Sequence, residues 1–242
     1  MKLIIIRHAD PDYSIDSLTE IGRTQAALLA DRVSQWDVKD FYVSPLGRAR
    51  DTAQPALEKM NREATVLDWL REFPPQIKRE GYKKSSCCWD WLPADWTRVE
   101  EYYDKKKWLE VPVYAESTVP EEYKKVTDGL DALLESHGYR REGNCYRVLE
   151  ANTDTIVLFC HFGLECVLLS HLLNVSPMIL WHGFCASPSS VTVLYTEERR
   201  KGIASFRASC FGDTSHLYAA GESPSFSGRF CEIYDNFEER HD

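Results

Sequence analysis

The sequence predicts an α/β protein with a mostly parallel central sheet flanked by helices on both faces. Short apolar segments alternate with amphipathic helical patterns along the chain, which is typical of β-α-β units. A chain of 242 residues, of which 43% are hydrophobic, can bury a sizeable core around such a sheet. We therefore expect a single domain over residues 1–242, with a cap or lid insertion at about 73–120.

The N-terminal elements follow one another closely. Residues 2–6 are apolar and form the first expected strand, and the helix after it begins behind Thr19, a favourable N-cap residue. A second strand is expected at 41–43. The helix expected over 46–60 contains Pro55, which should kink or divide it because proline lacks the backbone N–H.

The later elements complete the sheet. We expect 145–149 and 155–160 to form a hairpin, because the turn-like Asn152-Thr153-Asp154 lies between them. The other expected elements are a short strand at 66–67, a helix over 164–173, and strands at 190–195 and 203–210.

The insertion at about 73–120 interrupts this alternation with an aromatic and lysine-rich stretch. Too few of its apolar residues recur with the period of a helix or a strand to form a separate core. A long insertion of this kind is usually a lid or a binding loop over a site. Two roles remain open for Trp89, Trp91 and Trp96: an aromatic wall of a substrate pocket, or packing within the insertion itself.

Composition excludes several classes of protein. Asp and Glu number 38 against 29 Lys and Arg, so the net charge of −9 offers no broad surface for nucleic acid or an anionic membrane. No apolar stretch is long enough to span a membrane, and the eight cysteines form no C-x-x-C pair, so we expect a cytoplasmic protein without a structural metal. The sequence does not indicate the oligomeric state.

Reactive side chains follow several of the predicted strands. Arg7 and His8 follow the first strand, Arg48 lies shortly after the second, Glu72 after the third, and His161 directly after the apolar run IVLFC. Ligands of open α/β sheets bind outside the carboxyl ends of the strands. We therefore expect these side chains to meet at one rim of the sheet.

These residue types suit phosphoryl transfer. Arginine grips two phosphate oxygens at once, and a neutral imidazole can attack phosphorus to form a phosphohistidine. A carboxylic acid can protonate the leaving oxygen, a role open to Glu72. The motifs of other phosphate chemistries, such as G-x-x-x-x-G-K-S/T, are absent from the sequence. No metal or organic cofactor is required, and the expected partner is a small phosphorylated substrate.

Several motifs resemble those of the histidine phosphatase superfamily, the phosphoglycerate mutase-like proteins. They are IIIRHADPDYSIDSLTEIGRTQA, SPLGRARDTA, WLREF and VLFCHFG, in that order, with FGDTSHL near the C-terminus. The resemblance implies that His8 is the phosphorylated nucleophile and that Arg7 and Arg48 bind phosphate. It also implies that His161 is the second pocket histidine and Glu72 the proton donor.

Three departures from the family pattern refine the expected activity. Ala9 replaces the glycine of the usual R-H-G-E, Phe162 replaces a small residue after the second histidine, and the E-R-x-Y-G stretch of the mutases is absent. The leading hypothesis is a metal-independent phosphatase that hydrolyses a phosphate monoester through a phosphohistidine on His8. The alternatives are a phosphoglycerate mutase-like phosphomutase, and a catalytically silent relative that binds a phosphorylated ligand.

Overall fold

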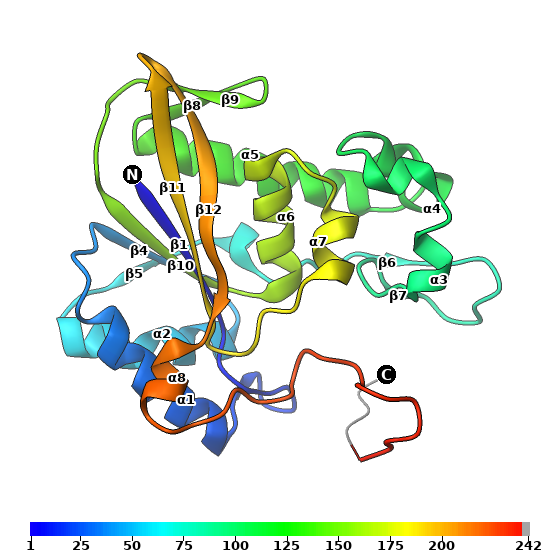
Figure 1. Cartoon of the computed structure of the whole chain (residues 1–242), viewed down its shortest axis with the longest axis horizontal. Coiled ribbons are helices and arrows are strands. Elements are labelled where there is room, and N and C mark those ends of the chain that lie inside the picture. Colours follow the sequence, from blue (N-terminus) through cyan, green and yellow to red (C-terminus); the bar gives the residue numbers. More distant parts are fainter. Residues whose placement is uncertain (239–242) are drawn as a thin grey trace.

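An eight-stranded sheet forms the centre of the protein in the computed structural model, which describes residues 1–238 (Figure 1). The strand order is β5-β4-β10-β1-β11-β12-β9-β8. The first four of these strands run parallel to one another, and the other four continue the sheet in antiparallel pairs. Their bounds are β1 Lys2–Arg7, β4 Asp40–Val43, β5 Ala64–Val66, β8 Tyr139–Glu142, β9 Cys145–Val148, β10 Thr155–Cys160, β11 Val191–Arg200 and β12 Ile203–Asp213.

Helices cover both faces of the sheet, which confirms the predicted α/β class. Successive residues of a strand point to opposite faces, so Leu3 and Ile5 of β1 join one core while Ile4 and Ile6 join the other. The helices on the Ile4 face are α1 Glu20–Val33 and α2 Gly47–Met60, and those on the Leu3 face are α5 Val119–Ser136, α6 Phe162–Leu173 and α7 Pro177–Gly183.

Short elements connect these layers. Two small ladders pair β2 with β3 and β6 with β7. Over residues 1–238, no helix is both long and apolar enough to cross a membrane. The bounds of the short elements are β2 Pro11–Asp12, β3 Ser17–Leu18, η1 Asp68–Leu70, β6 Gln76–Ile77, β7 Ser86–Cys87, α3 Pro93–Trp96, η2 Glu100–Tyr103, η3 Lys107–Glu110, α4 Pro112–Ala115 and α8 Ser215–Ala219.

The predicted hairpin between β9 and β10 is wrong. β9 pairs with β8 and β12, whereas β10 lies between β1 and β4 in the parallel half of the sheet. Every residue of β10 is buried, as a central parallel strand requires, while β9 has exposed positions and suits the periphery. The hairpin partner β8 reads Tyr-Arg-Arg-Glu, a polar sequence that gives no strand signal.

Two local expectations for the first helices have different outcomes. Thr19 is the N-cap of α1, where its hydroxyl oxygen accepts a hydrogen bond from the backbone N–H of Gly22 at 3.0 Å, as predicted. Pro55 does not divide the second helix, because α2 runs without interruption from Gly47 to Met60.

The insertion contributes large aromatic side chains to the same core as the sheet. Phe73, Tyr102, Trp108 and Tyr114 are each at most 1% exposed and lie in one apolar cluster with Leu3 of β1. Burial of this much aromatic surface gives the insertion a large share of the core's stability.

Candidate active site

Two histidines meet where adjacent parallel strands end. β1 and β10 are paired so that Arg7 lies opposite Cys160, which places the next residues, His8 and His161, side by side. The backbone N–H of His8 donates to the carbonyl of Cys160 at 2.9 Å, and the two imidazole ring centres are 5.1 Å apart. The strand pairing therefore brings together these two of the predicted site residues.

Hydrogen bonds hold both rings in defined orientations. His8 is 1% exposed, and its Nδ1 lies 2.8 Å from the carbonyl oxygen of Ala9. A carbonyl only accepts, so this contact requires the proton on Nδ1 and leaves the lone pair on Nε2. His161 is held by its Nε2, which lies 2.7 Å from the hydroxyl oxygen of Ser44 just beyond β4.

Burial and nearby positive charge keep both rings neutral. Burial, with the guanidinium groups of Arg7 and Arg48, holds the pKa of His8 well below the ordinary 6.5. The pKa of His161 is lowered by burial and by His8, Arg48 and Arg7. A neutral His8 has a free lone pair near neutral pH, which is what a nucleophile needs.

The two predicted phosphate ligands are fixed by different neighbours. Arg7 is 6% exposed, and its Nη1 donates to the carbonyl oxygen of Ala186. Arg48, in the first turn of α2, donates from Nη1 to Asp16 Oδ1 at 2.6 Å. Asp16 Oδ2 also accepts from the backbone N–H of Gly47 at 2.7 Å, so one carboxylate positions both the arginine and its helix.

Glu72 lies against the start of α6, the helix that His161 caps. Its Oε1 accepts from the backbone N–H of Phe73 at 2.8 Å and of Leu164 at 3.0 Å. Burial raises the pKa of this carboxyl above the ordinary 4.5, although both backbone hydrogen bonds, Arg7 and Arg48 oppose the shift. A carboxyl with a raised pKa is protonated more of the time and can act as an acid.

The insertion forms one wall beside this carboxyl, and its tryptophans divide between the two roles left open above. Trp89 donates from Nε1 to the carbonyl of Phe73 at 3.0 Å, and its ring meets the edge of Phe162 with centres 6.5 Å apart. Trp96 is buried and stacks on His182, at 5.2 Å between ring centres. Trp89 therefore lies beside Phe162 and, like Glu72, close to Gly163, whereas Trp96 packs in the core.

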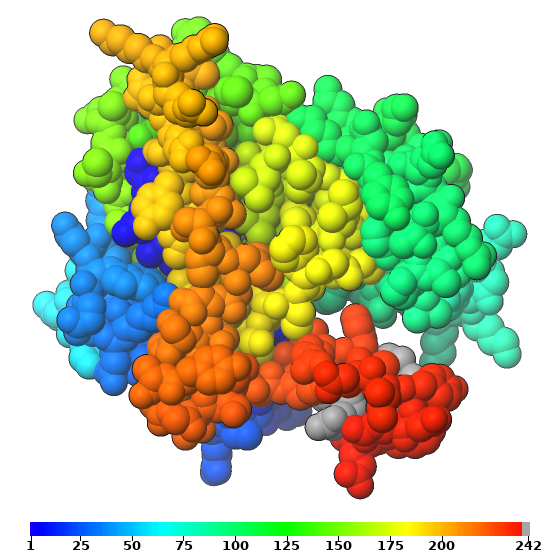
Figure 2. Space-filling view, in the orientation of Figure 1, coloured from blue at the N-terminus to red at the C-terminus, as the bar shows by residue number. Residues whose placement is uncertain are grey.

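The C-terminal segment, residues 221–238, also reaches the site, although no pattern in the sequence indicated this. A Cβ added at Gly228 would overlap with Nη1 of Arg7 and lie 3.1 Å from its Nη2, so backbone lies directly against the guanidinium. In Figure 2 this segment, drawn red, lies below parts of the surface coloured yellow and green, with a hollow between them. Asp16 and Ala186 were likewise missed, because each acts through a contact between distant parts of the chain.

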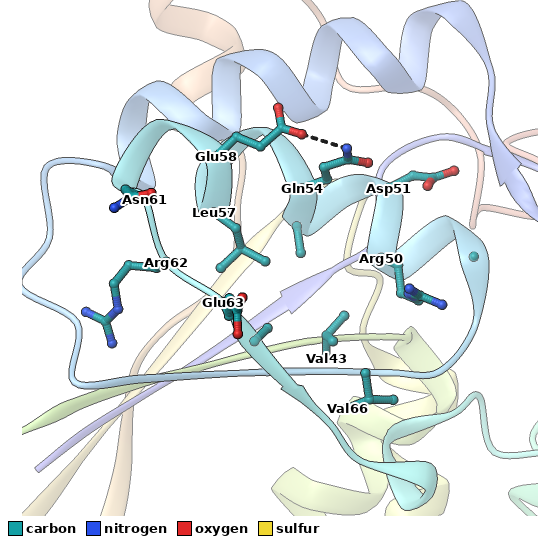
Figure 3. Close-up of a pocket in the computed structure, with 13 residues that line it drawn as sticks. Val43, Arg50, Asp51, Gln54, Leu57, Glu58, Asn61, Arg62, Glu63 and Val66 are labelled. Atoms are coloured by element: carbon teal, nitrogen blue, oxygen red, sulfur yellow. Dashed lines mark hydrogen bonds between the residues drawn. The ribbon is translucent and has the colours of Figure 1, made fainter.

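A second groove lies outside this rim, between α2 and the edge strand β5 (Figure 3). Its lining carries both signs of charge, including Arg50, Asp51 and Glu58, and Gln54 donates to Glu58 Oε1 at 2.6 Å. None of the five predicted site residues lines it. Within residues 1–238, no three His, Cys, Asp or Glu side chains gather as metal ligands would.

The rim defines a class of protein. A buried neutral histidine beside two arginines, a second histidine and a carboxyl of raised pKa is an arrangement for phosphoryl transfer at the carboxyl ends of parallel strands. The sequence profile of the histidine phosphatase superfamily (branch 1) matches residues 3–209. The chain belongs to this superfamily, as its motifs predicted.

Relatives and solved structures agree with this assignment. Phosphoserine phosphatase 1 of Hydrogenobacter thermophilus is 25% identical over 219 residues, which cover 87% of this chain and 93% of the relative. A 2,3-bisphosphoglycerate-dependent phosphoglycerate mutase of Thermoplasma acidophilum is 36% identical over 84 residues, covering 30% of this chain and 42% of the mutase. The family and the phosphoserine phosphatase support a phosphatase.

The fold is shared with solved phosphatases. Phosphoserine phosphatase of Entamoeba histolytica, solved with phosphoserine, has a TM-score of 0.57 at 21% identity, covering 89% of this chain and 98% of its own. A mycobacterial glucosyl-3-phosphoglycerate phosphatase has a TM-score of 0.60 at 22% identity, covering 88% and 99%. At these identities the likeness concerns the fold alone.

Proposed function

We propose that this protein is a metal-independent phosphomonoesterase that forms a phosphohistidine on His8. The observation that carries the proposal is the state of the His8 ring. It is buried and neutral, and its Nδ1 binds the carbonyl oxygen of Ala9, so that Nε2 keeps a free lone pair for attack on phosphorus. Arg7 and Arg48 stand beside it as phosphate ligands.

In the first step, Nε2 of His8 forms a bond to phosphorus while the bond from phosphorus to the leaving oxygen breaks. Glu72, whose pKa is raised by burial, gives a proton from its carboxyl to that oxygen, and an alcohol departs. Arg7, Arg48 and His161 hold the other phosphate oxygens, over which negative charge is spread.

In the second step, water attacks the phosphohistidine. The carboxylate of Glu72 takes a proton from the water, the bond between nitrogen and phosphorus breaks, and the electron pair returns to Nε2 of His8. Inorganic phosphate leaves and Glu72 is protonated again, so the cycle closes without a metal ion or organic cofactor.

The proposed substrate is a small organic phosphate monoester in the cytoplasm. Two matched phosphatases carry phosphoserine in their names, and Trp89 offers an aromatic surface beside Glu72 for the organic part of a substrate. The eight cysteines are all unpaired, which fits a reducing compartment.

The test is a panel of phosphate esters incubated with the protein in EDTA. We expect wild type to release inorganic phosphate and His8→Ala to lose at least about a thousandfold of the rate. A matched control is His171→Ala on α6, whose ring binds Asp131 and takes no part in the reaction. Release of phosphate by His8→Ala at the wild-type rate would contradict the mechanism.

Two other outcomes identify the alternatives. Accumulation of a phosphate isomer in place of inorganic phosphate would indicate a phosphomutase. Tight binding of phosphate without turnover of any ester would indicate a silent relative that only binds phosphorylated ligands.

A further inference from the structure

His216 is a buried histidine that the proposed reaction leaves without a role. It lies on the short helix α8, within the FGDTSHL motif near the C-terminus, and is 8% exposed. Its Nε2 lies 3.1 Å from the hydroxyl oxygen of Ser189, a fully buried residue in the loop between α7 and β11. A hydrogen bond between two buried side chains therefore joins segments that are 27 positions apart in the sequence.

Ser189 lies at the centre of a tight turn. The backbone N–H of Ser190 donates to the carbonyl of Ser187 at 3.1 Å and closes a turn with Pro188 and Ser189 at its two central positions. The φ of Ser189 is +63°, a left-handed conformation that favours glycine or asparagine. Serine is strained here, whereas glycine would not be, so the hydroxyl and its bond to His216 give the side chain a purpose.

The same turn holds Arg7 and His8. The backbone N–H of Ser189 donates to the carbonyl oxygen of His8 at 3.0 Å, and the N–H of Arg7 donates to the carbonyl of Ser190 at 3.1 Å. The guanidinium of Arg7 also donates from Nη1 to the carbonyl of Ala186. Because these hydrogen bonds join residues 186–190 to Arg7 and His8, a displacement of the turn would displace the nucleophile.

Helix α8 presents His216 to the turn from a fixed position. Asp213, at the end of β12, forms an ion pair with Arg32 of α1 at 2.5 Å, and its Oδ1 accepts from the backbone N–H of Ser215 at 2.8 Å. Burial and the charge of Arg32 lower the pKa of His216 to about 4, against the opposing charge of Asp213. The ring is therefore neutral when it binds Ser189.

We propose that His216 and Ser189 are positioning residues, which fix the turn at 186–190 and thereby hold His8 in line for attack on phosphorus. This role rests on the reaction proposed above, in which Nε2 of His8 bonds to phosphorus. The effect is indirect, since it passes from the ring of His216 to the hydroxyl of Ser189, and from the N–H of Ser189 to the carbonyl of His8. A small displacement of the nucleophile slows the chemical step, whereas Arg48, held by Asp16, keeps its place.

The first test compares the kinetics of His216→Phe and wild type on a phosphate ester. Phenylalanine keeps an aromatic ring but cannot form a hydrogen bond with Ser189. We expect kcat to fall about tenfold and KM to change less than about twofold, because misplaced reacting atoms affect the chemical step. The amide of His216→Gln can replace the ring nitrogen as a hydrogen-bond partner, so this variant should recover kcat to within about threefold of wild type.

The serine provides a second, independent variant. Ser189→Gly removes the hydroxyl but relieves the strain of a positive φ, so the turn itself is retained. If Ser189 served only the backbone of the turn, kcat would be unchanged or higher. A positioning role predicts the same loss of about tenfold as in His216→Phe. The double variant should lose no more than either single variant, because both changes remove the same hydrogen bond.

His137→Phe is a matched control. His137 is 7% exposed, and its Nε2 lies 2.8 Å from the hydroxyl oxygen of Tyr42 and 3.9 Å from Asp40, at the amino end of β4 and away from the rim. Loss of this buried hydrogen bond should lower stability, as in His216→Phe, but leave kcat unchanged. Thermal unfolding of every variant checks that it is folded.

Hydrogen exchange at the amide of residue 189 tests the positioning without turnover. This N–H is bound to the carbonyl of His8 in wild type, so its exchange should become at least about tenfold faster in His216→Phe. A protein that hydrolyses no ester would contradict the proposed function, and the exchange rate would still test the role of His216. The proposal is overturned by wild-type kcat in His216→Phe or Ser189→Gly, by an equal loss of kcat in His137→Phe, by additive losses in the double variant, or by an unchanged exchange rate.

Discussion

The parallel half of the sheet and the insertion carry different kinds of residue and serve different purposes. In the parallel half, reactive side chains follow strand ends directly, so strand pairing alone brings His8 beside His161. In the insertion, large aromatic side chains such as Trp108 pack into the core, and only the margin around Trp89 reaches the site. The reactive side chains therefore lie where strand pairing fixes the backbone, and the insertion mainly stabilises the core beside them.

The largest expected effect tests the chemical side of this comparison. Glu72→Gln should lower kcat by about a hundredfold to ten-thousandfold, because the amide cannot give a proton to the leaving oxygen. In wild type, kcat should fall as pH rises through the raised pKa of Glu72, since the proton is lost. Steady-state kinetics from pH 5 to 9 check both. A variant with wild-type kcat would remove Glu72 from the mechanism.

The next effect tests the insertion as part of the core. Trp108→Ala should lower the free energy of unfolding by about 3–5 kcal/mol, because it leaves a cavity among fully buried neighbours. Trp89→Ala, at a half-buried position beside the site, should cost less stability and change KM more. Urea unfolding and kinetics of the two variants check this, and equal stability losses would contradict the division of roles.

A third effect links the buried carboxyl of α6 to stability. The pKa of Glu165 is raised from 4.5 to about 7 in the folded protein, so its contribution to stability is complete at low pH and is lost as pH rises to 7. Above pH 7, Glu165→Gln should therefore be more stable relative to wild type than at pH 4.5, by on the order of 3 kcal/mol. Urea unfolding at the two pH values measures the difference, and a constant difference would refute it.

The smallest effect concerns the C-terminal segment. Gly228→Ala should displace Arg7 and raise KM about threefold, because the new Cβ overlaps with the guanidinium. Gly221→Ala is a matched control: both glycines have positive φ, but a Cβ at Gly221 meets nothing within 4 Å. The two alanine variants share the backbone strain, so only Gly228→Ala should change KM. Equal KM values for the two variants would show that the C-terminal segment does not influence the site.

The site residues that the sequence predicted are those marked by a pattern within a short stretch of the chain. The pair Arg7-His8 ends an apolar strand, and His161 ends another, so alternation and strand pairing were enough to place them. Asp16 carried no such signal, because its carboxylate acts through Arg48 and Gly47, which lie 32 and 31 positions later in the chain. The contact of Gly228 with Arg7 joins residues 221 positions apart, and no local pattern encodes it.

The same limit explains the wrong hairpin. β8 has no apolar alternation and is held by its pairing with β9 across the turn at Gly143, whose φ is +60°. Polar peripheral strands of this kind are recognisable only once their neighbours are placed.

The hydrogen bond between Nδ1 of His8 and the carbonyl of Ala9 has a stereochemical consequence. With Nδ1 protonated, phosphorus can attach only at Nε2, so the covalent intermediate is one of the two possible phosphohistidine isomers. The bond uses the main chain of residue 9, so alanine in place of the usual glycine leaves this regiochemistry intact. Phosphorus NMR of a trapped adduct would therefore show a single positional isomer, chosen by a backbone carbonyl and not by a side chain.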